Sequence, residues 1–279
     1  MRPFRGSEAL AAGTLTRGQL RWHHTQLLPD VYVHKDATLT DDVWAEATSV
    51  WTRGEGIVAG RTAARLLGAY RVPDGGPVEV ISSRRRPPPG VVLRAEHIAE
   101  DEIRHWSRYK LTTAARTALD LGRHLPRNDA VVILDALAGA GDLTYAAVDA
   151  LADRYRGTRG IVAARTAAWL MDGGAQSEQE TRLRLHLIDA GLPRPQTQIF
   201  IGDEHNCTVV PLGWPDVKVG VDFIRSEACH DIYQLRREGL QHEAAQLHDW
   251  FIVGLSDQEI PRVSVGRVSR ALRARRRGL

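Results

Sequence analysis

The stretch from Val209 to Arg225 constrains the fold of this chain more than any other part of the sequence. An apolar segment leads into a Trp-Pro turn, and beyond the turn valines alternate with polar or small residues as far as Asp222. An alternation with a period of two predicts a β-strand with one buried face, and the turn predicts a hairpin. In many nucleases a strand pair of this kind carries the carboxylates that bind metal.

The length of 279 residues favours two domains, each with its own core. A hydrophobic fraction of 43% and a charged fraction of 25% are typical of a globular protein. No apolar run approaches the roughly 18 residues that a membrane helix needs, and the first residues do not resemble a signal peptide. Cys207 and Cys229 do not form a disulfide framework. We therefore expect a cytoplasmic protein that has no membrane partner.

The net charge of +3 hides an unusual choice of basic residue, because Lys35, Lys110 and Lys218 are the only lysines among 37 basic residues. The planar fork of arginine suits phosphate groups and guanine edges better than lysine does. A GC-rich genome would produce the same arginine excess through codon bias. Basic clusters, and not the total, are therefore the useful indication of nucleic-acid binding.

The beginning of the chain predicts a small winged helix. Ser7 to Gly13 is typical of a short helix, Thr16 to His24 of a second helix capped by Thr16, and Leu27 to Val33 of a strand pair around a Pro-Asp turn. The second helix would present polar side chains to a DNA groove, and these are Arg17, Gln19, Arg21 and His23. A purely structural unit with a solvated polar face is an equal alternative.

Four motifs in this half of the chain resemble AbiEi-type antitoxins and their actinobacterial relatives. They are Leu-Thr-Arg-x-Gln-Leu from Leu15, Pro-Asp-Val-Tyr-Val from Pro29, Ala-Gly-Arg-Thr-Ala-Ala from Ala59, and the run from Leu111 to Leu121. The resemblance implies a winged helix that reads DNA for autoregulation. It also implies that the following portion serves antitoxin function or packing.

The middle of the chain combines two strands with several helices. Strands are expected at Val78 to Ile81 and Val91 to Arg94, and the loop between them carries Arg84, Arg85 and Arg86. That loop is either a phosphate-contacting loop or a solvated hairpin tip. Arg116 and Asp120 lie four residues apart on an expected helix, a spacing that favours an ion pair. Apolar periodicity then predicts a helical bundle, with helices from Asn128 to Ala138, Leu143 to Arg154 and Gly160 to Met171.

A linker at Asp172 to Gln176 precedes a second domain. Ser177 and Glu180 predict a capping box at the start of its first helix. Further segments alternate between strand and helix: strands at 197–201, 208–212, 217–223 and 251–255, and helices at 231–247 and 263–277. This order predicts a restriction-endonuclease-like α/β core. The whole chain is thus expected to be α+β or α/β, with a winged-helix region at 1–75, an α+β and helical connecting region at 76–172, and the endonuclease-like domain at 173–279.

The second domain resembles very-short-patch repair (Vsr-like) endonucleases of the PD-(D/E)XK superfamily. The resemblance rests on Ser-x-x-Glu at Ser177, Ala-Gly-Leu-Pro-x-Pro-x-x-Gln from Ala190, Leu-Gly-Trp-Pro from Leu212, Lys-Val-x-Val-Asp from Lys218, and the strand that follows Trp250. It implies DNA cleavage with Mg²⁺ bound by carboxylates. Active relatives carry Asp, Glu, Asp and His where this chain has Pro211, Asp222, Ile224 and Ala228. Since proline and isoleucine offer no ligand oxygen, we expect a degenerate site and no cofactor.

If activity survives, Asp222 is the remaining metal ligand, with Glu180 and Lys218 as the other catalytic candidates and Mg²⁺ as the cofactor. A zinc site built from His205, Cys207, Cys229 and His230 is a further alternative to ordinary thiols and surface histidines. Cys229 and His230 are adjacent, so their side chains would point apart on a strand or a helix.

The C-terminal segment is basic and amphipathic, and its arginines include Arg273, Arg275, Arg276 and Arg277. Such a segment can follow a nucleic-acid backbone, bind an acidic partner, or end the fold as a solvated helix. The leading hypothesis is an antitoxin-like or regulatory DNA-binding protein with a catalytically degenerate nuclease-fold domain and, as a further partner, a cognate toxin. The alternatives are a Mg²⁺-dependent DNA endonuclease and an antitoxin that binds protein without contacting DNA.

Overall fold

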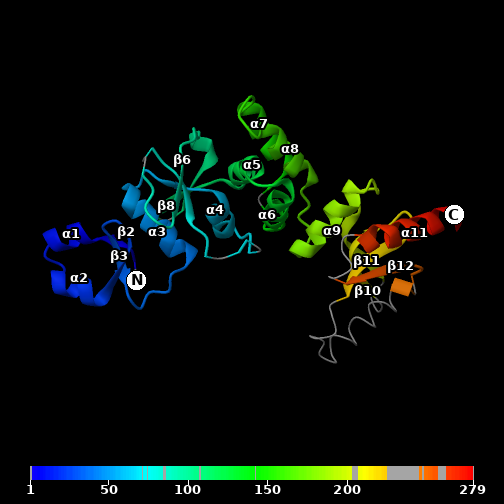
Figure 1. Cartoon of the computed structure of the whole chain (residues 1–279), viewed down its shortest axis with the longest axis horizontal. Helices are drawn as coiled ribbons and strands as arrows, with labels where there is room; N and C mark the ends of the chain where they lie inside the picture. Colours follow the sequence, from blue (N-terminus) through cyan, green and yellow to red (C-terminus); the bar gives the residue numbers. More distant parts are fainter. Residues whose placement is uncertain are drawn as a thin grey trace. The chain divides into compact units, whose positions relative to one another are not determined.

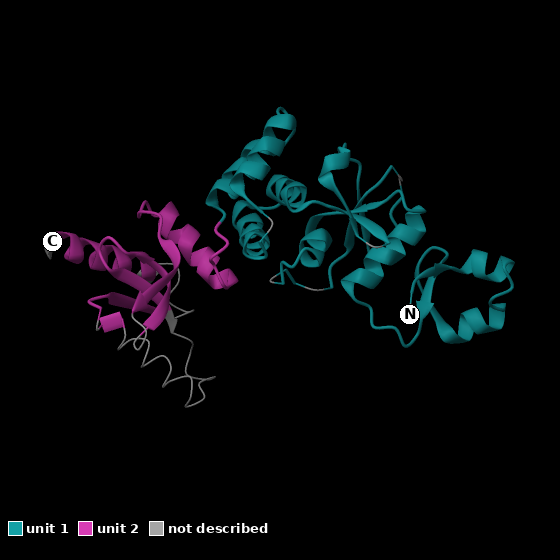
Figure 2. Cartoon of the chain, turned by 180° about the vertical axis from the view of Figure 1, so that it is seen from behind, with its two compact units in different colours: residues 1–171 teal, residues 172–279 magenta. Residues whose placement is uncertain are grey.

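A computed structural model of the chain describes residues 2–278 except 71, 74, 84–85, 107, 142, 203–206, 225–244, 247 and 257–261. The chain divides into two units, residues 1–171 and 172–279, shown in different colours in Figure 2. Both units combine helices with β-sheet, which confirms the expected mixed α and β class. Among the described residues, no helix is both long and apolar enough to cross a membrane.

The N-terminal part of the first unit is a three-stranded antiparallel sheet with two short helices. Its elements are β1 (Phe4–Arg5), α1 (Gly6–Ala11), α2 (Arg17–His23), β2 (His24–Leu28) and β3 (Val31–His34), and its strand order is β1-β3-β2. Pro29 and Asp30 form the expected turn, where Asp30 takes a φ of 62°. Helix, helix and hairpin follow one another as the sequence indicated. The winged-helix assignment stays a prediction.

A five-stranded sheet follows, with the order β6-β5-β4-β8-β7; Figure 1 labels two of its strands, β6 and β8. Its strands are β4 (Ile57–Val58), β5 (Val78–Ile81), β6 (Val91–Arg94), β7 (Ile103–Trp106) and β8 (Tyr109–Thr112), with the 3₁₀ helix η1 (Glu100–Glu102) before β7. Helix α3 (Asp41–Thr52) places Ala47 and Trp51 in one core with residues of both sheets. Helix α4 (Gly60–Leu66) follows β4. Because β4 lies before residue 75 and pairs with β5 after it, the sheet spans the expected boundary at 75–76.

Strands β5 and β6 are parallel, with Val78 opposite Val91 and Ile81 opposite Arg94. The segment between them therefore cannot be the tip of a hairpin, because the two strands of a hairpin run antiparallel. That alternative for the arginine-rich loop is wrong. The loop returns the chain from one end of the sheet to the other.

Four helices complete the first unit and agree with the expected bundle. They are α5 (Ala114–His124), α6 (Arg127–Gly139), α7 (Tyr145–Arg154) and α8 (Ile161–Leu170). The helices α5 and α8 approach closely at Gly122, where a Cβ atom would lie 2.7 Å from the Cα atom of Ala164. Any larger residue at position 122 would push these two helices apart.

The second unit contains a four-stranded sheet with the order β12-β11-β10-β9. Its elements are α9 (Glu178–Asp189), β9 (Gln196–Gly202), β10 (Cys207–Trp214), β11 (Val219–Ile224), β12 (Phe251–Ser256) and α11 (Arg262–Gly278). Strands β11 and β12 are parallel and the other pairs are antiparallel. Leu183 and Leu187 of α9 and Val268 and Leu272 of α11 pack against buried residues of this sheet. Most of the helix expected at 231–247 lies outside the described residues.

The capping box expected at Ser177 is only half formed. The Ser177 hydroxyl accepts a hydrogen bond from the Glu180 backbone N–H at 3.1 Å. The Glu180 carboxylate accepts from the backbone N–H of Gln176 at 2.8 Å, one residue before the position that a capping box uses. The helix still begins where the sequence indicated.

Candidate functional site

The start of helix α2 is defined by a complete capping box. The Thr16 hydroxyl accepts a hydrogen bond from the Gln19 N–H, and the Gln19 side-chain oxygen accepts from the Thr16 N–H at 2.9 Å. Gln19 was expected to approach a DNA groove. Its carbonyl oxygen is already used within the helix, so Gln19 serves first as a cap residue.

The exposed side of α2 carries Arg17, Arg21 and Trp22, with Gly18 between them on the helix surface. Leu20 is buried beneath the helix, whereas 71% of the Trp22 surface is exposed. Among the described residues, neither Arg17 nor Arg21 makes an ion pair. We refer to Arg17, Gly18, Arg21 and Trp22 as the α2 face. The signal for Trp22 in the sequence is its place beside Arg21 on a helix whose Leu20 is buried.

His23 lies apart from this face, against the strand pair. Its ring stacks on His34 with the ring centroids 6.4 Å apart and the planes 7° apart. His34 also meets the edge of His24 at 5.4 Å. His23 therefore joins the end of α2 to β3, and it is not grouped with Arg17 and Arg21.

The other arginines that the sequence suggests for DNA contact differ in their exposure and in their hydrogen-bond and ion-pair partners. Arg84 and Arg85 lie outside the described residues, and Arg86 is exposed. On α11, Arg275 forms an ion pair with Asp249 at 3.1 Å, and the Arg273 Nε donates to the Ser269 carbonyl at 3.2 Å. Arg276 and Arg277 are exposed and, within the described part of the chain, form no ion pair.

The expected nuclease positions meet at one place on neighbouring strands. Leu212 pairs with Val221 and Gly213 with Gly220, and Pro211 and Asp222 are the next residues along their strands. On the other side of β10, the register places Gln198 opposite Pro211, and Gln198 takes a φ of 48°. A proline stands where the second carboxylate of a metal site would be needed.

Near Gln198 and Pro211, the backbone is irregular, and the side chains of β10 change from one face of the sheet to the other. Leu212 packs with α9 and α11, whereas Val210 packs with Trp250 in a different core cluster. In a regular strand, residues two apart share a face. Asp222 shares a face with Gly220, whose Cβ position contacts Val210 and Ile252. The half-buried Asp222 thus lies on a side of the sheet with apolar neighbours.

Lys218 and Glu180 were the other residues expected to act with Asp222. Lys218 lies in the turn before β11 with a φ of 51°, and its Nζ donates to the His248 carbonyl at 3.3 Å. A strand rises about 3.3 Å per residue, so the Cα atoms of Lys218, in the turn before β11, and of Asp222, within β11, lie about 13 Å apart. The structure does not bring this pair together. Glu180 is buried at the start of α9.

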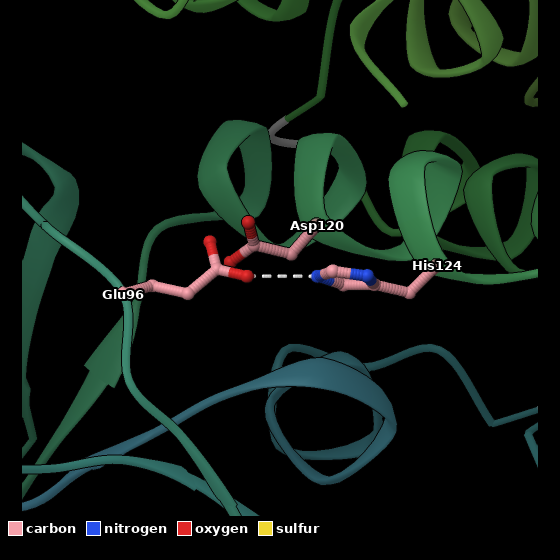
Figure 3. A group of neighbouring side chains, drawn as sticks. All are labelled: Glu96, Asp120 and His124. Carbon is pink, nitrogen blue, oxygen red and sulfur yellow. Dashed lines mark hydrogen bonds and ion pairs between the residues drawn. The ribbon is translucent and has the colours of Figure 1, made fainter. Parts of the chain in front are cut away.

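A different group of possible metal ligands lies in the first unit. Glu96, Asp120 and His124 place one ligand atom each within 4.8 Å of the others, as Figure 3 shows. No other such trio occurs among the residues that the structure describes, and none therefore involves Asp222 or Cys207. His205, Cys229 and His230, which the zinc alternative requires, lie outside the described residues. The sequence reasoning missed this trio because Glu96 comes from a loop far from α5.

The trio does not fit a metal ion, because arginines already occupy its carboxylates. Arg123 bonds to Glu96 at 2.6 Å and to Asp120 at 3.2 Å, while Arg116 bonds to Asp120 at 2.8 Å and to Glu96 at 3.2 Å. The remaining Glu96 oxygen lies 2.9 Å from His124. A divalent cation would have to displace these bonds and sit beside two guanidinium groups. The group is an ion-pair network.

Arg116 is the centre of this network and is only 1% exposed. It also bonds to Glu102 at 2.5 Å, to the His97 carbonyl at 3.0 Å and to the Tyr155 hydroxyl at 3.1 Å. Tyr155 in turn donates to Glu102 at 2.9 Å. The Arg116–Asp120 pair that the sequence predicted is confirmed, and it is one part of a larger buried structure that joins η1, α5 and the end of α7.

The network shifts the pKa values of its carboxyl groups in opposite directions. Hydrogen bonds from His124 and from Arg123 outweigh burial and lower the pKa of Glu96 to about 2. Burial raises the pKa of Asp120 despite the attraction of Arg116. The pKa of Tyr155 is raised by burial and by its hydrogen bond to Glu102. These shifts follow from ion pairing and burial, and none identifies a catalytic acid or base.

No family model matches this chain. Two Mycobacterium tuberculosis proteins, the uncharacterized proteins MT2308 (strain CDC 1551 / Oshkosh) and Rv2248 (strain H37Rv), are each 28% identical over 217 residues, which is 77% of this chain and 80% of theirs. Among solved structures, the RV2827C protein of Mycobacterium tuberculosis covers 73% of this chain and 84% of its own at 14% identity, with a TM-score of 0.44. Neither similarity points to an activity.

Proposed function

We propose that this protein binds duplex DNA through the α2 face and acts as an antitoxin-like regulator whose nuclease-like unit does not cut DNA. The observation that carries the proposal is the α2 face itself: two arginines without ion pairs and a largely exposed tryptophan on a capped helix. Arginine side chains of this kind neutralise phosphates and read guanine edges. The exposed arginines at the end of α11 are a second basic surface for the DNA backbone.

The strand pair β10–β11 supports the proposed absence of cleavage. Pro211 has no oxygen in its side chain, and Lys218 is about 13 Å from Asp222 along the strand. Hydrolysis of a phosphodiester with Mg²⁺ depends on several oxygen ligands around the ion. One half-buried aspartate beside a proline is a poor basis for this reaction.

The test is the salt dependence of duplex binding by the full chain, measured by fluorescence anisotropy. We expect the affinity of the wild-type protein to fall steeply with salt, and the double substitution Arg17→Ala and Arg21→Ala to reduce the logarithmic salt slope by about 2, or roughly one for each lost phosphate contact. Alanine suits a helix and leaves the Thr16–Gln19 cap intact, so α2 should still form.

Arg156→Ala is the matched control, because Arg156 is an exposed arginine of the same unit and, among the described residues, its ion pair is with exposed Asp153. It should leave the salt slope unchanged. An equal loss in the control and in the double variant would contradict the role of the α2 face. No binding of the wild-type protein even at low salt would contradict DNA binding altogether.

A further inference from the structure

The second unit contains a cavity of about 510 Å³ beside the starts of β11 and β12. Three segments that are distant in sequence line it: the turn Asp216–Lys218, the residues Asp249 and Phe251 around the start of β12, and Ala271, Ala274 and Arg275 of α11. Figure 1 shows α11 lying beside β11 and β12. A cavity of this size is in the range of small-ligand sites.

The wall of the cavity combines the charged residues with an apolar part, which includes an accessible aromatic ring. Val217 and Ala271 are buried, whereas 51% of the Phe251 surface is exposed. The Phe251 backbone N–H donates to the Lys218 carbonyl at 2.9 Å, which holds the start of β12 against the turn before β11. The backbone of Phe251 is therefore held in place by a hydrogen bond, and the face or edge of its ring is accessible to a ligand.

Two charged residues at the rim adopt strained backbone conformations. Lys218 has a φ of 51° and Asp249 a φ of 62°. Each is held by a further bond: Lys218 Nζ donates to the His248 carbonyl at 3.3 Å, and Arg275 donates to the Asp249 carboxylate at 3.1 Å and to its carbonyl at 2.8 Å. Left-handed conformations of residues other than glycine concentrate at ligand sites, where the surrounding structure maintains them.

The outer edge of the cavity is positively charged. Arg270 and Arg277 lie four residues before and three residues after Ala274, so they flank it on the same side of α11. Both are exposed, and the Arg270 Nε donates only to the Gly266 carbonyl of its own helix. Lys218 adds a third cation inside the rim. Asp216 is an exposed carboxylate that can accept hydrogen bonds.

We propose that this cavity binds one unpaired nucleotide of DNA, with the base against Phe251 and the adjoining phosphates at Arg270 and Arg277. An exposed aromatic ring next to a basic helix provides the two interactions that unpaired nucleic acid uses, stacking and phosphate contact. Lys218 and Asp216 supply a donor and an acceptor for the polar edge of a base. The proposal rests on DNA binding by this protein and adds a preference for an unpaired base.

The experiment compares two DNA probes with the full-length protein. One is a fully paired duplex, and the other is the same duplex with a single unpaired 2-aminopurine, whose fluorescence falls when it stacks on an aromatic ring. We expect tighter binding of the second probe, with quenching. Phe251→Ala should weaken binding of that probe by about 5-fold to 100-fold, since stacking on an aromatic residue contributes that much per base. It should leave the affinity for the paired duplex unchanged.

Phe200→Ala is the matched control, because Phe200 is also an exposed phenylalanine of the same sheet, at 64%, and does not line the cavity. It should change neither affinity, and near-ultraviolet circular dichroism of both variants reports whether the fold is kept. Equal affinity of the wild-type protein for the two probes, or equal losses in Phe251→Ala and Phe200→Ala, would overturn the nucleotide site while leaving duplex binding intact.

A third probe separates DNA from an acidic protein partner, which could use the same aromatic and basic groups. This probe is a short peptide with one phenylalanine between two aspartates. If the wild-type protein binds the peptide more tightly than the Phe251→Ala variant does, and the unpaired base does not change the affinity for DNA, the nucleotide assignment is wrong. Failure of the proposed function has a different signature: the wild-type protein then shows no salt-dependent binding to either DNA probe.

Discussion

Arg116 is the centre of a buried network of polar contacts in the first unit. It holds Asp120 on its own helix, Glu102 from η1, and Glu96 and the His97 carbonyl from the segment after β6. Its guanidinium also lies over the ring of Tyr155, 5.1 Å from the centroid. Because these partners come from four segments, Arg116 links the five-stranded sheet to the helical bundle.

Replacing Arg116 by alanine should lower the free energy of unfolding of the first unit by about 3–5 kcal/mol, since removing one partner leaves buried carboxylates without a balancing charge. The loss of stability should be largest at Glu102, which is only 1% exposed. Denaturant unfolding measures the change. Arg156→Ala, which breaks an exposed pair, should cost at most about 1 kcal/mol. Similar losses in the two variants would contradict a central role for Arg116.

Glu96 should make the stability of the first unit depend on acid pH. Its pKa is about 2 in the folded protein, against an ordinary value of 4.5. A carboxyl group with a lowered pKa stabilises the fold above its unfolded pKa, and this contribution is lost as the pH falls through the folded value. The stabilising contribution of Glu96 is therefore complete above about pH 4.5 and disappears towards pH 2.

The substitution Glu96→Gln should reduce the free energy of unfolding by about 1–3 kcal/mol at neutral pH, with the difference from wild type shrinking as the pH approaches 2. The charge of Glu96 helps to raise the pKa of Asp120, so the difference between the two proteins reports Glu96 together with this effect on Asp120. Urea unfolding at several pH values provides the measurement. A difference that is independent of pH would mean that the charge of Glu96 does not contribute.

At the scale of elements, the local pattern of the sequence was a good guide. Helix α2 begins at the Thr16 cap, the strands β2 and β3 meet at Pro29 and Asp30, and β11 follows the alternation that ends at Asp222. These features depend on residues a few positions apart, so the sequence carries them directly. The parallel pairing of β5 and β6 was not apparent from the sequence, because it depends on a longer connection that leads back along the sheet.

For the candidate site, the sequence predicted the types of residue but not their positions relative to one another. The sequence indicated that Pro211 has no side-chain oxygen where the resemblance implies a metal ligand, and the structure places this proline next to Leu212, which pairs with Val221. It did not indicate that Lys218 lies in a turn with a positive φ just before the start of β11. The distance between Lys218 and Asp222 depends on where the strand starts, a detail that the motif does not contain.

The strand pair β10–β11 leads to a prediction about divalent metal. Adding Mg²⁺ or Mn²⁺, or removing them with a chelator, should leave the unfolding temperature unchanged, because Pro211 cannot serve as a ligand beside Asp222. A supercoiled plasmid incubated with the protein and either ion should remain unnicked. Nicking that disappears in Asp222→Ala would show that the site is active and would favour the endonuclease alternative.

At the scale of the whole molecule, each of the two units has its own buried core. Residues 1–171 include the cluster around Trp51 and Val80, and residues 172–279 include the cluster around Leu212, Val221 and Leu272. A separate core is the physical requirement for a segment to fold alone. The boundary lies beside the segment Asp172 to Gln176, which the sequence marks as a linker.

A chain limited to residues 172–279 should therefore fold, with a cooperative thermal transition and dispersed amide resonances. Arg116→Ala in the full protein should lower the transition of the first unit without altering the intrinsic stability of that fragment, because Arg116 belongs to the other core. A fragment without a cooperative transition would show that residues 172–279 require the rest of the chain.

The sequence by itself determined the mixed class and the positions of most helices and strands among the described residues, as well as the lack of a side-chain oxygen at position 211. Each of these follows from residue type and from neighbours within a few positions. The tertiary structure decided that Arg116 gathers three carboxylates, that Gln198 and Pro211 change the face of a strand, and that Lys218, Phe251 and Arg275 enclose one cavity. These features join segments many residues apart, and their geometry arises only when the chain packs.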